Sequence, residues 1–295
     1  MTYSIIALCI LLTIVNGNVE QRIEKLMGLQ QNYQHTQSES FFYYTQVAKC
    51  SLKSISNWNC GSFCEHHPDM VEVKAFYKSD HHAQAYVGYN KKENLVVVVY
   101  RSTQDFINWY NNIKFFKHDF GDCKNCKVHL GFWETYDDVS LEVLAAAKHL
   151  KEKYPTSKIL VTGHSLGGAV AYLAAVDLKK LGYNIDYFFT YGAPRIGTHE
   201  FAVWFTSYVG ATEHWRVTHY RDMVIHQPPS SFSYKHPPQE VWYAHDNKSY
   251  KICSSGIDED PTCANSIIGD SAADHTSYFN VSGACTEEFT EDIEI

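Results

Sequence analysis

The sequence predicts an α/β fold in which helices flank a central, mostly parallel sheet. Leu95–Val99 is a continuous apolar run rich in β-branched valine, which is typical of a strand covered on both faces. From that run onward, strand-like and helical segments alternate along the chain. Strand–helix–strand units of these lengths form parallel sheets with right-handed crossovers, so we expect an α/β sandwich.

The elements follow one another in a regular order. Residues 36–49 predict a helix, and the strands at 71–77 and 83–89 predict an antiparallel hairpin. The helix that begins at Gly131 carries an apolar stripe and ends before Pro155. Further strands are expected at Lys158–Thr162, Ile185–Tyr191 and His214–His219, and helices at Gly131–Lys153, Ala169–Leu181 and Glu200–Tyr208.

The N-terminus has the pattern of a signal peptide. Ile5–Val15 is apolar but too short to span a bilayer, and the small residue Gly17 follows it. We expect residues 1–17 to be removed and residues 18–295 to form a single domain, because no Pro/Gly/Ser-rich linker divides them. A buried first helix is the alternative. No later stretch is apolar enough for a transmembrane segment, so the protein is expected to be secreted or lumenal.

The cysteines fit an oxidising compartment. The chain has nine, and Cys9 would leave with the signal peptide, so that an even number remains to pair. Spacing alone leaves the connectivity open. Three pairs are near neighbours and two cysteines are left near the domain ends: Cys60 and Cys64, Cys123 and Cys126, Cys253 and Cys263, then Cys50 and Cys285. Cys123-x-x-Cys126 could instead be redox-active or bind zinc, but no second pair stands at zinc-finger spacing, and we expect neither metal nor cofactor.

Two further features concern the surface. The net charge is −8 and no basic patch stands out, so nucleic acid is not an expected partner. Asn247 and Asn280 begin Asn-x-Ser sequences, which are glycosylation acceptors in a secreted chain.

A nucleophilic serine is predicted in Gly163-His164-Ser165-Leu166-Gly167, which fits the pattern G-x-S-x-G. A short apolar strand runs into this segment and an alanine-rich helix runs out of it. That context places the Ser165 hydroxyl on a tight turn at the carboxyl edge of the sheet, where glycines let the neighbouring backbone pass closely. Because the pattern is common by chance, the strand–turn–helix context carries the prediction.

A serine nucleophile needs an acid and a base, which follow it in the order Asp, then His, in this arrangement. Asp222 comes directly after a predicted strand, whereas Asp177 lies in a helix and Asp186 begins a strand. The candidate bases are His226, His236, His245 and His275. A position near the C-terminus favours the last of these.

The predicted chemistry is acyl transfer. His275 would take the Ser165 proton as the hydroxyl attacks a carbonyl, while Asp222 orients the imidazole. The resulting oxyanion needs hydrogen-bond donors. We expect these from the backbone N–H of Leu166 and from the loop after the central strand, where Thr103 offers an amide and a hydroxyl.

Taken together, these residues resemble the class 3 lipases, the fungal triacylglycerol lipase type, over essentially all of the mature sequence. The matching blocks are Tyr100–Thr103, Asn108-Trp109, Lys127–Phe132, Val161–Ala169, Tyr191–Arg195, Arg221–Val224 and Asp274–Phe279. The resemblance implies the α/β-hydrolase fold and the roles given above for the triad and the oxyanion donors. It also implies the disulfides Cys50–Cys285, Cys60–Cys64 and Cys253–Cys263, which leaves Cys123 and Cys126 as an additional pair.

The segment after Thr103 resembles the lid helix of that family. Phe106, Ile107, Trp109 and Tyr110 are too apolar for a solvated loop. A lid would cover Ser165 in water and open at a lipid surface. An ordinary helix packed into the core is the alternative.

Two positions depart from the family pattern. Ser102 stands where the family usually has glycine, which removes the easy route to a positive φ in the oxyanion loop. Asn112 stands where the lid helix tends to end in an aspartate that supports the oxyanion residue. The asparagine keeps an acceptor but loses the charge.

The sequence therefore predicts a hydrolase of acylglycerol esters that acts at a lipid–water interface through an acyl-enzyme. A phospholipase A or a feruloyl-type esterase of the same family, an acyltransferase and an inactive lipid-binding protein remain as alternatives. The complete set of Ser165, Asp222 and His275 argues against the last of these. Oligomeric state stays open.

Overall fold

The computed structural model describes residues 33–103, 106–254, 259–281, 283 and 285, and for Phe106 and Trp109 it describes the backbone alone. Within this part, the residues from Gln34 onward belong to one compact unit. The expected signal peptide, residues 1–17, lies outside the described residues.

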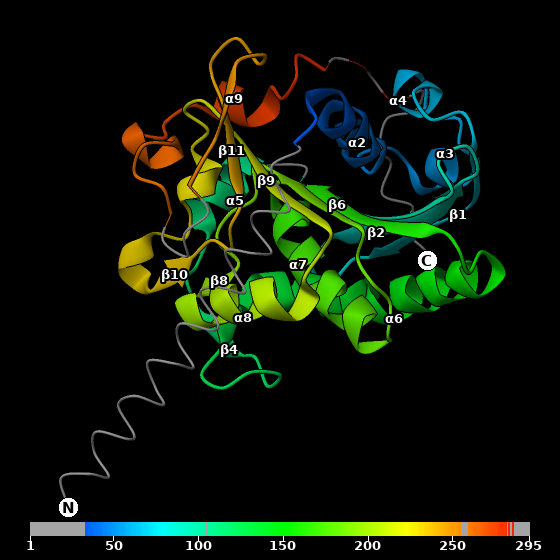
Figure 1. The fold of residues 1–295 in the computed structure, drawn as a ribbon, viewed down its shortest axis with the longest axis horizontal. Coiled ribbons are helices and arrows are strands. Elements are labelled where there is room, and N and C mark those ends of the chain that lie inside the picture. Colours follow the sequence, from blue (N-terminus) through cyan, green and yellow to red (C-terminus); the bar gives the residue numbers. More distant parts are fainter. Residues whose placement is uncertain (1–32, 104–105, 255–258, 282, 284, 286–295) are drawn as a thin grey trace, which may run out of the picture. The chain divides into compact units, whose positions relative to one another are not determined.

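An eight-stranded sheet forms the centre of the fold, in the order β1-β2-β3-β6-β7-β9-β11-β12 (Figure 1). The five strands from β3 to β11 run parallel, while β1 and β2 on one side and β12 on the other are antiparallel additions. The predicted mostly parallel sheet is thus confirmed. The strands are β1 (Met70–Lys78), β2 (Ala83–Asn90), β3 (Leu95–Tyr100), β6 (Lys158–His164), β7 (Tyr187–Tyr191), β9 (Glu213–His219), β11 (Glu240–Tyr243) and β12 (Tyr250–Ile252).

Helices cover both faces of this sheet (Figure 1). Helix α2 contacts β3, β6 and β7 on one face, and α6 and α7 pack on the other. All of β3 is buried: Val96, Val98 and Tyr100 join the core under α6 and α7, and the alternating residues face α2. The helices are α2 (His35–Val47), α3 (Leu52–Ser56), α4 (Ser62–Glu65), α5 (Phe106–Asn112), α6 (Leu130–Lys153), α7 (Leu166–Lys180), α8 (His199–Val209) and α9 (Ala272–Thr276).

A second, four-stranded antiparallel sheet was not predicted. Its strands are two or three residues long, too short for an alternating pattern to identify them. They are β4 (Lys117–Asp119), β5 (Lys127–His129), β8 (Gly197–Thr198) and β10 (Tyr234–Lys235). Three 3₁₀ turns complete the described elements: η1 (Val224–His226), η2 (Ser230–Phe232) and η3 (Ala264–Ser266).

Most predicted boundaries differ from the observed ones by one to three residues. The largest shift is at α7, which begins at Leu166 rather than Ala169, because the helix starts directly on the turn that carries Ser165. Strand β7 begins at Tyr187 rather than Ile185. Helix boundaries are expected to vary by this amount, since the terminal turns lack the full set of backbone bonds.

Four disulfides join the eight cysteines that lie among the described residues. They are Cys50–Cys285, Cys60–Cys64, Cys123–Cys126 and Cys253–Cys263. The pairs are those that the resemblance and the neighbouring positions had suggested, so the structure places Cys123 and Cys126 in a bond rather than at a zinc site.

The two predicted glycosylation sites differ in accessibility. Asn280 is exposed, whereas Asn247 is 3% exposed, and its side-chain oxygen accepts a hydrogen bond from the backbone N–H of Phe279 at 3.0 Å. The Asn247 amide nitrogen lies 3.3 Å from Ser277 Oγ. The Asn280 side chain also takes part in this cluster, since its amide nitrogen lies 3.4 Å from the Asp246 carbonyl oxygen. Glycosylation of either residue stays a prediction.

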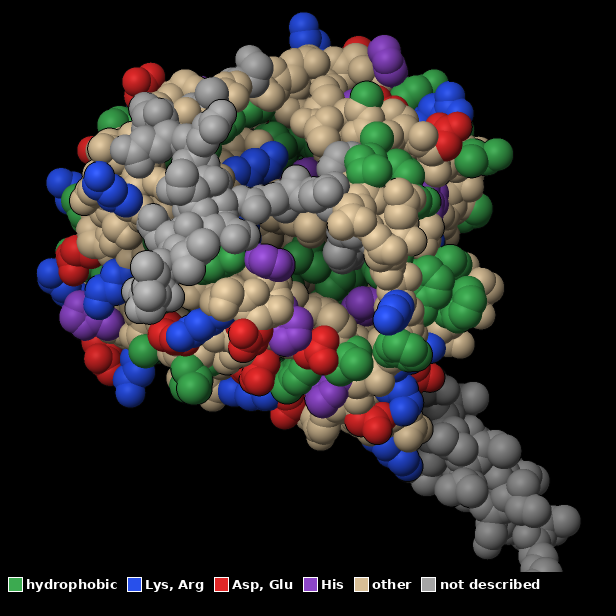
Figure 2. Space-filling view, turned by 180° about the vertical axis from the view of Figure 1, so that it is seen from behind, with side chains coloured by type: hydrophobic (Ala, Val, Ile, Leu, Met, Phe, Trp, Pro, Cys, Tyr) green, Lys and Arg blue, Asp and Glu red, His purple; other side chains and the backbone are tan. Residues whose placement is uncertain are grey.

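The described surface shows no extended region of one charge in the view of Figure 2, where acidic and basic side chains are intermixed over the lower part of the face. Among the described helices, none combines the length and the apolar character that crossing a bilayer requires.

Candidate active site

Ser165 lies between the end of β6 and the start of α7, with φ 56° and ψ −129°. Two glycines make this turn possible. A Cβ at Gly163 would come within 2.3 Å of the Gly167 backbone, and a Cβ at Gly167 within 2.1 Å of the Tyr100 carbonyl oxygen. Contacts that short are forbidden, so both positions require glycine. The turn is therefore fixed by crowding between β6, α7 and β3.

The structure brings the three predicted residues into one chain of hydrogen bonds. His275 Nε2 lies 2.8 Å from Ser165 Oγ, and His275 Nδ1 lies 3.0 Å from both carboxylate oxygens of Asp222. All three side chains are at most 1% exposed. Among the described histidines, His275 is the one bonded to Ser165; His236, one of the alternatives, instead contacts the Ile225 carbonyl oxygen.

Asp222 is held by two further donors. The Tyr278 hydroxyl donates to Oδ2 at 2.6 Å, and the backbone N–H of Val224 donates to Oδ1 at 2.8 Å. Burial and the Asp222 charge raise the pKa of Tyr278 well above its ordinary value, so its hydroxyl remains a donor. Sequence reasoning did not single out Tyr278, although it stands three residues after His275 in a block that matched the family.

His164 packs against the ring of His275 and contacts its backbone. Its Nε2 lies 2.8 Å from the His275 carbonyl oxygen, and the two rings stack with centroids 4.7 Å apart. Burial, followed by the nearby His275 and Lys49, lowers the pKa of His164 well below 6.5. The ring is therefore neutral, and because a carbonyl accepts, Nε2 carries the proton and Nδ1 is an acceptor. Within the described residues, Nδ1 is buried and has no hydrogen-bond partner.

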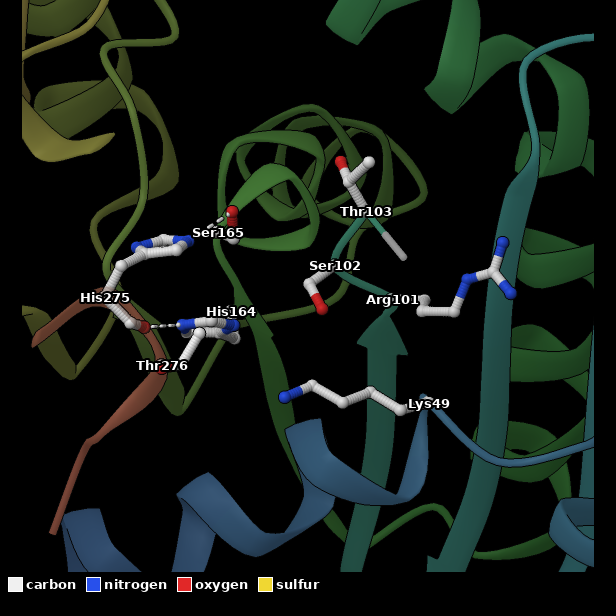
Figure 3. Close-up of a pocket in the computed structure, with 8 residues that line it drawn as sticks. All are labelled: Lys49, Arg101, Ser102, Thr103, His164, Ser165, His275 and Thr276. Carbon is white, nitrogen blue, oxygen red and sulfur yellow. Dashed lines mark hydrogen bonds between the residues drawn. The ribbon is translucent and has the colours of Figure 1, made fainter. Parts of the chain in front are cut away.

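A pocket of about 330 Å³ opens onto the serine (Figure 3). The Thr103 hydroxyl oxygen is buried without a partner among the described residues, and the N–H of Leu166 belongs to the first turn of α7, where no acceptor within the helix exists. These are the two donors that the sequence predicted for the oxyanion. The lining residues are Lys49, Arg101, Ser102, Thr103, His164, Ser165, His275 and Thr276.

The serine at position 102 fits its loop without strain. The described non-glycine residues with positive φ do not include Ser102, although they do include Ser165. Since the backbone here does not use the left-handed region, the loss of the family glycine has no conformational cost.

The residues of the predicted lid form helix α5. Ile107 is 44% exposed, and the Tyr110 hydroxyl lies 3.2 Å from the Gln227 amide nitrogen. The side chains of the other two predicted lid residues, Phe106 and Trp109, are outside the described part. The exposed Asn112 donates through its amide nitrogen to Asn108 Oδ1 at 2.6 Å and to the Asn108 carbonyl oxygen at 2.8 Å, both within α5. Whether its oxygen serves as the acceptor that replaces the family aspartate stays a prediction.

Comparison with known proteins gives a consistent set of relatives. The sequence model of the class 3 lipases matches residues 97–232. A lipase of Rhizomucor miehei is 31% identical over 84% of this chain and 70% of its own length. A secreted mono- and diacylglycerol lipase of Fusarium solani is 37% identical over 68% of this chain and 61% of its own. The chain thus spans about two thirds of the length of these curated relatives.

A solved structure agrees with the sequence relatives. The crystal structure of a lipase from Rhizopus microsporus var. chinensis superimposes with a TM-score of 0.77 at 30% identity. The superposition covers 84% of this chain and 87% of the other.

Proposed function

The chain belongs to the class 3 lipase family and is a carboxylic ester hydrolase; from this premise we propose that Ser165, His275 and Asp222 are its catalytic residues. We propose further that it is secreted and hydrolyses ester bonds of acylglycerols. The observation that carries the proposal is the continuous hydrogen-bonded chain from Ser165 Oγ through His275 to Asp222, at the wall of a pocket of about 330 Å³.

Acylation begins with a proton transfer. His275 Nε2, 2.8 Å from the serine oxygen, takes the proton while Ser165 attacks the ester carbonyl. The imidazolium that forms is stabilised by Asp222, whose own charge is held by Tyr278 and Val224. The proton then passes from His275 to the alkoxide of the leaving glycerol, and the acyl-enzyme remains.

Charge on the carbonyl oxygen must be stabilised in both half-reactions. The Leu166 N–H, at the positive end of α7, and the Thr103 hydroxyl and amide are the donors that we assign to this oxyanion. Water, deprotonated by His275, then attacks the acyl-enzyme through the same kind of tetrahedral intermediate and releases the fatty acid.

Acylglycerols are the proposed substrates because of the relatives and the lid position. One relative is a secreted mono- and diacylglycerol lipase, and α5 follows the pocket residue Thr103 in the chain with an apolar sequence, as a lid helix would. The disulfides and the N-terminal apolar run support secretion. As one catalytic domain without cofactor, the enzyme would need only substrate and a lipid–water interface.

Active-site labelling tests the proposal. A fluorophosphonate probe should modify the wild-type protein and the surface variant Ser207→Ala, whereas Ser165→Ala should not react. A panel of triolein, phosphatidylcholine and methyl ferulate then ranks the substrate classes. Labelling that persists in Ser165→Ala would remove this serine as nucleophile, and a preference for methyl ferulate would replace acylglycerols with feruloyl esters.

A further inference from the structure

Lys49 places a cationic group in the catalytic pocket. The residue follows α2, and Figure 3 shows its side chain running beneath Ser102 toward His164, so that the ammonium group reaches the pocket that Ser165 lines. Its described hydrogen bond goes to the side-chain oxygen of Gln46, at 2.7 Å. An ammonium group has three N–H donors, so this bond leaves two of them for a ligand.

The Lys49 charge has no counter-ion among the described residues. Ion pairs between described side chains do not include it, and burial alone lowers the pKa of Lys49 to about 8. The amine is still mainly protonated at pH 7. A partly desolvated cation attracts an anion far more strongly than an exposed one does, because the local dielectric constant is low.

The other cation of the pocket is already engaged. Arg101 donates to Gln84 Oε1 at 3.1 Å and to the His82 carbonyl oxygen at 2.7 Å. Figure 3 shows its guanidinium group pointing away from Ser165. Lys49 is therefore the cationic side chain that faces a ligand at Ser165.

A second, independent feature lies on the same side of the pocket. His164 is 3% exposed, its Nε2 is used by the His275 carbonyl, and its Nδ1 is a buried acceptor without a partner in the described structure. Both residues line the pocket, and Figure 3 shows the Lys49 ammonium group pointing toward His164. Together they offer a cationic donor that uses one of its N–H groups on Gln46 and a neutral acceptor without a described partner.

We propose that Lys49 and His164 form a subsite for an anionic oxygen group of the ester, so that the enzyme favours acyl esters of glycerol phosphate over neutral acylglycerols. Phosphate oxygens accept from the ammonium group, and an adjacent hydroxyl, or the P–OH of a monoester, donates to His164 Nδ1. This subsite rests on the proposed ester hydrolysis at Ser165 and specifies its substrate class. A carboxylate on the acyl chain could supply the same anionic oxygen atoms in place of the phosphate.

Matched pairs of soluble esters test the subsite on the full-length secreted protein. One pair is dibutyroylglycerol and its phosphate, and the other is p-nitrophenyl butyrate and p-nitrophenyl hemiglutarate, which carries a carboxylate on the acyl side. The variants are Lys49→Met, which keeps the length and loses the charge, Lys49→Arg, which keeps the charge, and Lys148→Met on the exposed face of α6 as the control.

The expected result is a fall in kcat/KM for the anionic ester and not for the neutral one. Lys49→Met should lower kcat/KM for the phosphate ester about 10- to 100-fold, the range for a charge-assisted hydrogen bond, and change the neutral ester less than about 3-fold. Lys49→Arg should retain most of the preference, and Lys148→Met all of it. A selective loss with the hemiglutarate alone would assign the subsite to an acyl-side carboxylate.

Two results would refute the subsite of Lys49 and His164 and leave the proposed ester hydrolysis at Ser165 intact. An equal loss on neutral and anionic esters would make Lys49 a positioning residue for His164, and no loss on either would leave it without a role in substrate choice. Failure of the wild type to hydrolyse any of the four esters would instead refute the proposed function. Calorimetric titration of Ser165→Ala with hexyl phosphate, with and without Lys49→Met, measures the subsite independently of turnover and should show at least 10-fold weaker binding in the double variant.

Discussion

The residues around Ser165 and helix α5, the proposed lid, are held in opposite ways. The catalytic floor, which we define as Ser165, His275, Asp222, Tyr278 and His164, is almost fully buried and linked by hydrogen bonds of 2.6–3.0 Å. Helix α5 exposes Ile107 and satisfies Asn112 within its own turn. The catalytic floor is held by these bonds, whereas the described part of α5, the proposed lid, reaches outside the helix through the 3.2 Å contact between the Tyr110 hydroxyl and the Gln227 amide nitrogen.

This difference separates two tasks. Preorganised donors and acceptors lower the barrier of the chemical step because they need no rearrangement when charge develops. Segments with exposed backbone and few packed contacts open at low cost in free energy, which suits a gate. Variants in the floor should therefore change turnover on every ester, and variants in α5 should change it only where access limits the rate.

The largest effect is expected from Asp222→Asn. The amide keeps the shape of the side chain but favours the wrong imidazole tautomer, so kcat should fall about 10⁴-fold on soluble and emulsified esters alike. Steady-state kinetics on p-nitrophenyl butyrate and tributyrin measures this. A fall in kcat on emulsified tributyrin alone would contradict a role of Asp222 in the chemical step, since it would mean that Asp222 affects the access of substrate to the site.

Thr103→Val should have the next largest effect. It removes the hydroxyl at nearly constant volume, and losing one oxyanion donor lowers kcat about 100- to 1000-fold. The conservative variant Thr103→Ser keeps the hydroxyl and should retain most activity. Equal activities of the valine and serine variants in kcat measurements would show that the backbone amide alone serves the oxyanion.

Acid should lower the free energy of unfolding, because buried histidines stay neutral in the folded protein and bind protons in the unfolded chain. Burial, and then the Arg216 charge, lowers the pKa of His214 to about 3, against 6.5 in the unfolded chain. Below pH 6.5 the unfolded state binds a proton that the folded state does not, so stability falls as the pH drops from 6.5 toward 3. In His214→Phe, the loss of unfolding free energy between pH 7 and pH 5 should be smaller by about 2 kcal/mol.

Urea unfolding at the two pH values measures this difference, with the exposed His149→Gln as the control. Phenylalanine suits the site because the ring of His214 packs against Tyr172, Phe188 and Phe205. An unchanged pH dependence in His214→Phe would show that the folded protein protonates this ring without cost.

The smallest effect is expected in α5. Ile107→Ser should lower the rate on emulsified tributyrin about 3- to 10-fold, because an exposed apolar side chain that meets lipid is lost, and leave the rate below the solubility limit unchanged. Asn112→Ala, which breaks a bond within the same helix, serves as the control. An equal effect of Ile107→Ser on dissolved and emulsified substrate would contradict the role of α5 as a lid.

The sequence predicted those elements that a short stretch of neighbouring residues identifies. β3 is a run of buried apolar residues and the Ser165 turn has its glycines and its helix, so strand, turn and helix could be placed together. The disulfide partners and the triad followed from order along the chain and from the family resemblance. The edge strands of the small sheet have no such signal, because two or three residues are too few to show a period.

What sequence reasoning missed depends on contacts between distant segments. Lys49 faces the site only because the fold brings it to the same pocket as His164, and Asn247 is buried only because the chain near Phe279 folds over it. The effect of Ser102 could not be judged either, since whether a serine is strained depends on the φ that the fold imposes. Each of these properties is set by tertiary structure and not by the residue and its neighbours.

The bond between Cys50 and Cys285 closes most of the chain into a covalent ring, with 235 positions of sequence separation. In the chain-entropy treatment, a ring of that size stabilises the folded state by about 5 kcal/mol. It also changes what a protease can achieve. A single cut anywhere between these two cysteines leaves one molecule and not two fragments, so a clip in the loop between Ser165 and His275 would not let the two halves of the active site diffuse apart.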